Sequence, residues 1–261
     1  MKWLSRIICV ITAVILLMPS AFAETEKADA TAFKAADGIT VDGDLSEWNL
    51  SSPIRIEDAT QIIRDESFWQ GPMDCSCVVY VMWDETNLYL AVDVTEDTPF
   101  GASEMLELDH QDNFKLFLST DPDADPNRQT YGTNDFMLYL IVDNLYWDTG
   151  IDRSMVEKDA RERFVSKGMS GGENVLEGYE RAAVTTTTGF IYEAAIPWKN
   201  FSNENIPVYT PVVGDEIKFD FAITDISYAC PGTEYIPQMA WTGTLDINTN
   251  PSLWGRLTFA E

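Results

Sequence analysis

The sequence predicts an all-β fold, a single and mostly antiparallel β-sandwich. Three observations support this prediction. Short segments rich in Val, Leu, Phe and Tyr recur along most of the chain. Turn residues separate these segments, as they do in sandwiches and barrels. Apolar residues make up 45% and aromatic residues 12% of the 261 positions, which is ample for one buried core.

The N-terminal residues 1–23 have the features of a secretory signal peptide. Lys2 and Arg6 precede an apolar run over residues 7–18, and the small-x-small pattern of a cleavage site ends at Ala23. The apolar run is too short to span a bilayer comfortably. We therefore expect cleavage after Ala23 and a secreted, periplasmic or cell-surface protein without membrane insertion. An uncleaved N-terminal anchor is the alternative.

Residues 24–36 are small and charged, and they indicate a flexible N-terminal lead-in to one domain over residues 37–261. Tight turns are expected at residues 84–87 and around Gly189, because both places combine turn residues with flanking apolar segments. The segments expected to form strands cover residues 77–84, 87–97, 113–120, 135–147, 179–198, 216–226, 239–245 and 254–260.

Residues 154–167, SMVEKDARERFVSK, differ from the segments around them. Charged residues and good helix formers predominate there, and glycines follow at 168, 171 and 172. This segment therefore predicts a short helix. The chain has no internal repeat and no low-complexity linker, so a single domain fits the sequence.

The chain is strongly acidic, with 43 Asp and Glu against 17 Lys and Arg and a formal net charge of -26. Such a charge repels nucleic acid and anionic lipid, so neither is an expected partner. It is compatible with calcium binding, with a salty habitat or with solubility alone.

Three cysteines remain after cleavage of the signal peptide: Cys75, Cys77 and Cys230. In an oxidising compartment one disulfide is expected, which joins Cys230 to either Cys75 or Cys77. A bond between Cys75 and Cys77 would close a strained ring. A metal site of the Cys-x-Cys kind lacks other soft ligands nearby.

No catalytic constellation stands out, so we expect a binding protein and not an enzyme. His110 is the only histidine, and any Ser-His-Asp or Cys-His centre would require it. The sequence has no Gly-x-Ser-x-Gly elbow, no phosphate-binding glycine loop and no haem-attachment motif. The acidic residues are too numerous for a glycosidase pair to be singled out.

Two groups of aspartates are candidates for calcium binding. The alternating aspartates of residues 121–125 have the spacing of an oxygen-ligand loop, but the proline at 126 excludes an EF-hand. A solvated hairpin tip is the simpler interpretation of that loop. Asp97 ends one expected strand and Asp112 begins the next, so the two could converge on one ion; these are the predicted metal ligands, supported only by the family resemblance given below.

Exposed aromatic side chains are candidates for carbohydrate contact, because sugar rings stack on aromatic faces. Trp83 alternates in phase with apolar neighbours and is expected in the core. Trp69 lies in a polar stretch, Trp147 ends an expected strand and Trp241 lies in another. Trp69, Trp147 and Trp241 are therefore the predicted ligand-binding residues.

Several of these stretches together resemble the carbohydrate-binding module family 9. ITVDGDLSEW (39–48) is similar to the family's entry motif, and FIYEAAIPWKNF (190–201) to its Glu-Ala-Ala-Ile-x-Trp strand. The hairpin at 79–97, the strand at 110–121 and the closing segment at 239–259 also match in order. The resemblance implies a β-sandwich, often with bound structural calcium and without catalysis.

The family's binding residues do not carry over in the same way. Family members clamp a glycan between two Trp rings, and the corresponding places here hold Asp109 and Asn248. Lys115 stands where the family has an acid that bonds sugar hydroxyls, and a family glutamine falls near Ala222 or Ile223. The resemblance thus implies a glycan-binding protein that lacks the usual Trp clamp.

We therefore expect a secreted, non-catalytic glycan-binding protein with a calcium-stabilised sandwich. One alternative is a structural or adhesive surface scaffold that binds no sugar. The other is a sandwich that binds a b-type haem, as related domains in some dehydrogenase subunits do, with His110 or Met105 as an axial ligand.

Overall fold

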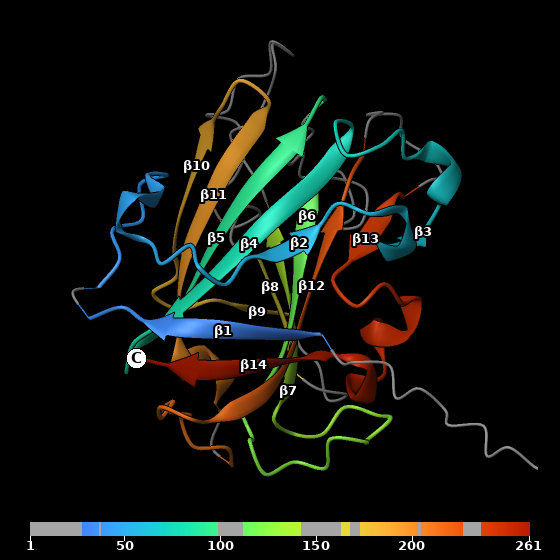
Figure 1. Cartoon of the computed structure of the whole chain (residues 1–261). Coiled ribbons are helices and arrows are strands. Elements are labelled where there is room, and N and C mark those ends of the chain that lie inside the picture. The colour runs from blue at the N-terminus through green and yellow to red at the C-terminus, as the bar shows by residue number, and fades with distance from the viewer. Residues whose placement is uncertain are drawn as a thin grey trace, which may run out of the picture.

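The computed structural model of the protein describes residues 28–36, 38–98, 112–141, 163–167, 173–202, 205–226 and 236–261. Most of the regular structure in these ranges is β-strand (Figure 1). The strands are β1 (Asp29–Lys34), β2 (Ile54–Ile56), β3 (Ile62–Arg64), β4 (Cys75–Trp83), β5 (Asn87–Glu96), β6 (Asn113–Ser119), β7 (Asp135–Ile141), β8 (Arg163–Lys167), β9 (Glu173–Val175), β10 (Glu180–Thr185), β11 (Gly189–Pro197), β12 (Glu216–Thr224), β13 (Gln238–Ala240) and β14 (Gly255–Ala260). Short 3-10 helices are η1 (Leu45–Glu47), η2 (Ala59–Gln61), η3 (Glu66–Phe68), η7 (Trp198–Phe201), η8 (Leu245–Asn248) and η9 (Pro251–Leu253).

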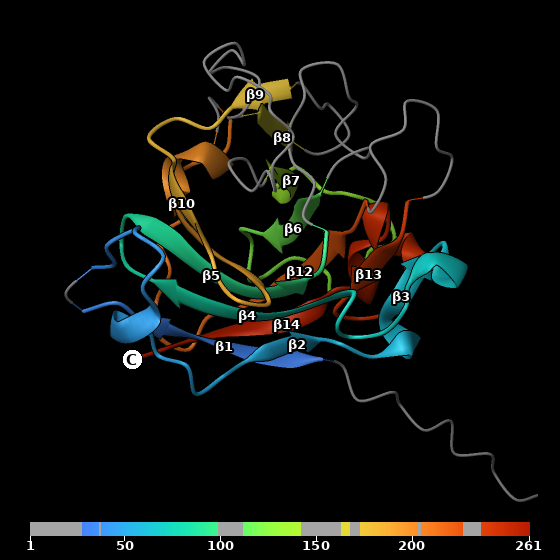
Figure 2. The same cartoon turned by 90° about the horizontal axis from the view of Figure 1, so that it is seen from above.

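The strands form one continuous sheet in the order β10-β11-β5-β4-β1-β14-β12-β6-β7-β8-β9, with β2, β3 and β13 paired beside it. Among the described strand pairs, only β1 with β4 and β1 with β14 are parallel. The sheet folds over on itself, so that β4, β5 and β11 face β6, β7 and β12 (Figure 2). This arrangement confirms the predicted all-β sandwich. The first group is called the first half below, and the second group the second half.

Alternate residues of the facing strands fill the main core between the two halves. Its members include Leu88, Leu90, Val92 and Val94 of β5, and Phe114, Leu116 and Leu118 of β6. Trp83 is buried in this core, as the sequence predicts. Its indole N–H donates to the carbonyl oxygens of Ala32 and Ala260, both at 3.1 Å, so Trp83 joins β4 to β1 and β14.

The segment that follows β1 covers the outer face of the first half and is held there by Glu193 of β11. The carboxylate of Glu193 accepts the backbone N–H groups of Asp42 at 2.8 Å and Gly43 at 2.6 Å. It also accepts the indole N–H of Trp48 at 2.7 Å. Glu193 is fully buried, and this burial raises its pKa. The entry motif and the Glu-Ala-Ala-Ile strand, which lie far apart in sequence, are therefore one structural unit.

The prediction of a flexible lead-in over residues 24–36 is wrong for residues 29–34, which form β1. This strand lies between β14 and β4 and pairs with both. Its two inward residues are Ala30 and Ala32, which have little intrinsic strand propensity. Pairing with two other strands, which local sequence does not show, outweighs that weak local preference.

The prediction of a short helix over residues 154–167 is wrong for residues 163–167, which form β8. Residues 154–162 lie outside the described part of the chain. β8 pairs with β7 on one side and β9 on the other. The two ladders of backbone hydrogen bonds favour a strand even though the segment contains good helix formers.

The predicted hairpins are confirmed. β4 and β5 are joined by a turn at residues 84–86, and β10 and β11 by a turn at residues 186–188. Within the expected strand at 135–147, β7 ends at Ile141 and the remaining residues are outside the described ranges. No described helix is long and apolar enough to cross a membrane.

Candidate functional site

A thiol and three carboxylic acids form a cluster at one end of the main core. Cys75 is the first residue of β4 and Glu96 the last of β5, and the two are directly paired. Asp112 precedes β6 and Asp225 follows β12; the adjacent residues of these two strands are also paired. These four residues, named the acid–thiol cluster, therefore place two neighbouring side chains on each half of the sandwich.

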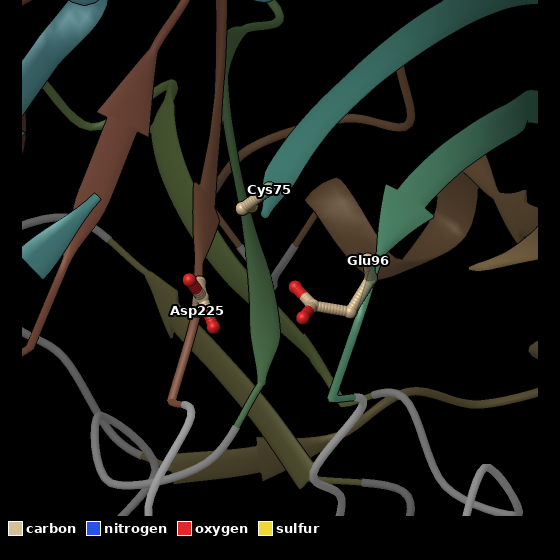
Figure 3. Close-up of side chains that lie close together, drawn as sticks. All are labelled: Cys75, Glu96 and Asp225. Carbon is tan, nitrogen blue, oxygen red and sulfur yellow. The ribbon is translucent and has the colours of Figure 1, made fainter. Parts of the chain in front are cut away.

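The four side chains take inward-facing positions that apolar residues occupy elsewhere in the sandwich. Glu96 continues the alternation of the buried residues of β5, and Cys75 does the same in β4. All four are at most 5% exposed. One sulfur or oxygen atom from each of Cys75, Glu96 and Asp225 lies within 4.8 Å of the other two. Figure 3 shows the Glu96 carboxylate directed from the end of β5 toward Asp225.

Charge is costly in the acid–thiol cluster. Burial, followed by repulsion from Asp112 and Asp225, raises the pKa of Glu96 to about 10. Burial also raises the pKa of the Cys75 thiol well above its usual range, and the charges of Glu96 and Asp225 raise it further. A bound cation would favour the anionic forms of all these groups, because its positive charge would offset the free-energy cost of burying them and the repulsion between them.

Of the two predicted metal ligands, Asp112 lies in the cluster and Asp97 does not. Asp112 is buried, and its Oδ1 accepts the backbone N–H of Ile226 at 2.7 Å. The side chain of Asp97 is exposed. Sequence reasoning missed Glu96 and Asp225, although the period-two pattern of their strands could have identified both as inward-facing.

The donor set fits calcium poorly. Calcium takes six to eight oxygen ligands, typically carboxylates, carbonyls and water. The group whose atoms lie within reach of one ion includes the sulfur of Cys75 and omits Asp97. The pairing of Asp97 with Asp112 around calcium stays a prediction.

A second set of polar side chains lies on the outer face of the second half, away from the main core. Asn113, Thr224 and Gln238 occupy neighbouring positions across β6, β12 and β13. The side-chain amide of Gln238 donates to Thr224 Oγ1 at 2.9 Å. One step along the sheet, Lys115 Nζ lies 4.9 Å from the centre of the Tyr139 ring.

Two tyrosines extend this outer polar face. Tyr131 and Tyr139 are half-buried. Burial raises the pKa of Tyr131, and the nearby Asp135 and Tyr139 raise it further. The Tyr131 ring packs edge-on against Trp254, with centroids 5.3 Å apart. Its hydroxyl is buried and has no hydrogen-bond partner in the described part of the structure. This outer polar face thus combines aromatic rings with hydrogen-bonding groups.

The predicted ligand-binding tryptophans do not form one surface. Trp69 is half-buried and donates its indole N–H to the Cys75 carbonyl at 2.8 Å. Trp241 is half-buried and packs edge-on against Phe219 of the main core, with centroids 6.2 Å apart. Trp147 lies outside the described residues. The ligand roles of all three remain predictions.

Several other residues singled out in the sequence also lie outside the described ranges, namely Met105, Asp109, His110 and Cys230. Cys75 and Cys77 are both buried and free, so the structure shows no disulfide at either of them. Asn248, at the place of a family clamp residue, lies in η8 and donates its side-chain amide to Leu245 O at 3.0 Å.

The alternating aspartates of residues 121–125 lie in the loop between β6 and β7. Asp121 and Asp125 each accept, through Oδ1, the N–H of the residue two positions on. The Arg128 guanidinium donates two hydrogen bonds to the carboxylate of Asp135 at the start of β7. Such turns are typical of a self-contained hairpin tip.

Two solved structures are similar to this one in fold. A carbohydrate binding module family 9 from Caldicellulosiruptor kristjanssonii in complex with cellotriose is 16% identical, with a TM-score of 0.53 over 89% of this chain and 94% of that chain. A putative carbohydrate-binding protein from Bacteroides uniformis is 10% identical, with a TM-score of 0.55 over 89% of this chain and 99% of that chain.

Sequence comparison extends the likeness to nearly the whole domain. Endo-1,4-beta-xylanase A of Thermoanaerobacterium saccharolyticum is 23% identical over 218 residues, which are 83% of this chain and 14% of that protein. The chain thus spans about a seventh of the relative's length. The family model described as carbohydrate family 9 binding domain-like matches residues 42–261. The chain therefore belongs to the carbohydrate family 9 binding domain-like family.

Proposed function

We propose that the protein is an exported, non-catalytic carbohydrate-binding module. The observation that carries this proposal is the family match over residues 42–261. Two further comparisons support it. The similar modules from Caldicellulosiruptor kristjanssonii were solved in complex with cellotriose and with glucose. The similar xylanase is far longer than this chain, as expected if the shared part is one module among several.

The outer polar face is the part of the described structure best suited to a glycan. Sugar recognition needs an aromatic ring that stacks on the apolar face of the sugar, together with polar groups that bond its hydroxyls. Tyr139 and Tyr131 supply half-buried rings, and Lys115 and Gln238 are buried polar side chains on the same face, 4% and 3% exposed. The buried Tyr131 hydroxyl is the sharpest indication, because it has no hydrogen-bond partner among the described residues and a sugar hydroxyl that reached it would supply that bond.

Isothermal titration against cello- and xylo-oligosaccharides tests the proposal. We expect binding of at least one series, and Tyr131→Phe is expected to weaken it about fivefold, which corresponds to one hydrogen bond of about 1 kcal/mol. The same variant should leave the melting temperature unchanged or higher, because no described residue makes a hydrogen bond to this hydroxyl. Tyr139→Ala is expected to weaken binding about tenfold or more.

Tyr80→Ala is the matched control, since Tyr80 is a half-buried strand tyrosine on the outer face of the first half. It should leave the affinity unchanged. Trp69→Ala and Trp241→Ala test the sequence predictions separately. No heat of binding to any oligosaccharide would contradict the proposed function, and loss only in the tryptophan variants would place the ligand elsewhere.

Export is the second part of the proposal, and residues 1–23 support it through their basic head, apolar run and small-x-small end. Expression of the full chain in a bacterial host, followed by mass analysis of the exported protein, tests it. We expect a mature N-terminus at Glu24. A chain that stays in the cytoplasm with residues 1–23 intact would contradict export.

A further inference from the structure

Cys75 is the unusual member of the acid–thiol cluster. Its side chain is 1% exposed and makes no hydrogen bond within the described residues. Its sulfur nevertheless lies within 4.8 Å of a carboxylate oxygen of Glu96 and one of Asp225. A small apolar side chain would fill an inward position of this kind without placing a group that can ionise beside two acids. The neutral thiol packs there as a small apolar group would, and it also places a sulfur ligand beside two carboxylates.

The chemistry of the three donors selects among cations. Calcium and magnesium take oxygen ligands, whereas zinc combines Cys sulfur with Asp or Glu oxygen in four-coordinate sites. One thiolate and two carboxylates supply three protein ligands, and the negative charge of Asp112 lies beside them. A dipositive ion would offset half of the negative charge that these four groups carry when ionised, and burial makes that charge costly.

We propose that Cys75, Glu96 and Asp225 bind a thiophilic divalent cation of the zinc type, and that this ion replaces the calcium expected from the sequence. Cys75 and Glu96 come from paired strands of the first half, and Asp225 follows β12 of the second half. The bound ion would join the two halves at the end of the core where they are not connected by β1 and β14. Such a site does not require carbohydrate binding.

Zinc titration of the chelator-treated, reduced full-length protein tests the site in the absence of any sugar. We expect one zinc ion per chain and a higher melting temperature. Cobalt provides a spectroscopic probe, because a thiolate ligand gives a sulfur-to-cobalt charge-transfer absorption that oxygen ligands do not give. Cys75→Ser should abolish this absorption and weaken zinc binding at least tenfold. Glu96→Gln and Asp225→Asn should weaken zinc binding while the absorption persists at saturating cobalt.

Cys77→Ser is the matched control. Cys77 is also buried and free, lies two residues along β4 on the same inward face, and is outside the group of possible ligands. It should leave zinc affinity and the cobalt spectrum unchanged. Calcium binding that is tighter than zinc binding and insensitive to Cys75→Ser would overturn the proposal, and so would loss of the absorption in Cys77→Ser. If Cys75→Ser does not fold, the cobalt spectrum of the wild-type protein still tests the proposal. Cobalt binding without charge-transfer absorption would exclude the thiol as a ligand.

Discussion

Replacing Glu193 by alanine is expected to lower the free energy of unfolding by about 3–5 kcal/mol, because three donors, one buried and two partly buried, lose their acceptor at once. These donors are the backbone N–H groups of Asp42 and Gly43 and the indole N–H of Trp48. A loss of this size is a large part of the total stability of an ordinary domain. Urea denaturation followed by tryptophan fluorescence measures it.

Glu180→Ala is the control for Glu193→Ala, since Glu180 is an exposed acid on the neighbouring strand β10. It should change the stability by less than about 0.5 kcal/mol. In Glu193→Ala the segment over residues 38–48 should also lose protection from hydrogen exchange before the rest of the sandwich does. A Glu193→Ala protein as stable as the wild type would contradict the role assigned to this carboxylate.

Acidification from pH 8 to pH 5 is expected to stabilise the protein, and buried Asp220 of β12 is one cause. Asp220 is fully buried, and this burial raises its pKa from the usual 3.8 to about 7. The folded state therefore prefers the protonated carboxyl. The stability that this preference supplies is fully present below pH 4 and is lost as the pH rises through 7. The shift corresponds to about 4 kcal/mol in total, of which about 2–3 kcal/mol falls between pH 5 and pH 8.

Asp220→Asn isolates this contribution, because the amide oxygen can still accept the Thr242 hydroxyl that Asp220 Oδ2 accepts at 2.6 Å. We expect the stability of the variant relative to the wild type to be about 2–3 kcal/mol more favourable at pH 8 than at pH 5. Asp93→Asn, at an exposed position of β5, removes the same charge and should show no such pH dependence. Equal effects of the two substitutions would indicate general charge repulsion, not burial of Asp220. Both pH values lie above the isoelectric point of about 4.1, which limits precipitation.

The strands that the sequence predicts are those whose side chains alternate strongly. β4, β5, β6 and β12 alternate large apolar residues with others, and each was expected within a few residues of its observed bounds. β1 was missed because its inward residues are alanines, and β8 because its pairing with β7 is not visible locally. Three-residue strands such as β2 are too short for any period to be read.

The candidate site was less predictable, because it depends on which strand ends meet in space. Asp112 was identified from its place before a strand, but the sequence offers no reason to combine it with Asp225, more than a hundred positions away. Cys75 was considered for a disulfide, and a Cys-x-Cys metal site lacked other soft ligands nearby in the sequence. The inward alternation of β5 distinguishes Glu96 from Asp97, and applying this alternation to the ends of strands would have identified Glu96 as the inward-facing acid.

The parallel pairing of β1 with β14 has a consequence for the order in which the chain can fold. Asp29 and Arg256 are partners in this ladder and also an ion pair, although they are 227 positions apart in sequence. The most N-terminal of the described strands therefore has its main partner in the most C-terminal one. Until β14 is available, β1 can form only its short ladder with β4. Contacts of such long separation form slowly, so closure of the sandwich should be a late step in folding, with strand edges exposed to chaperones or to aggregation until it occurs.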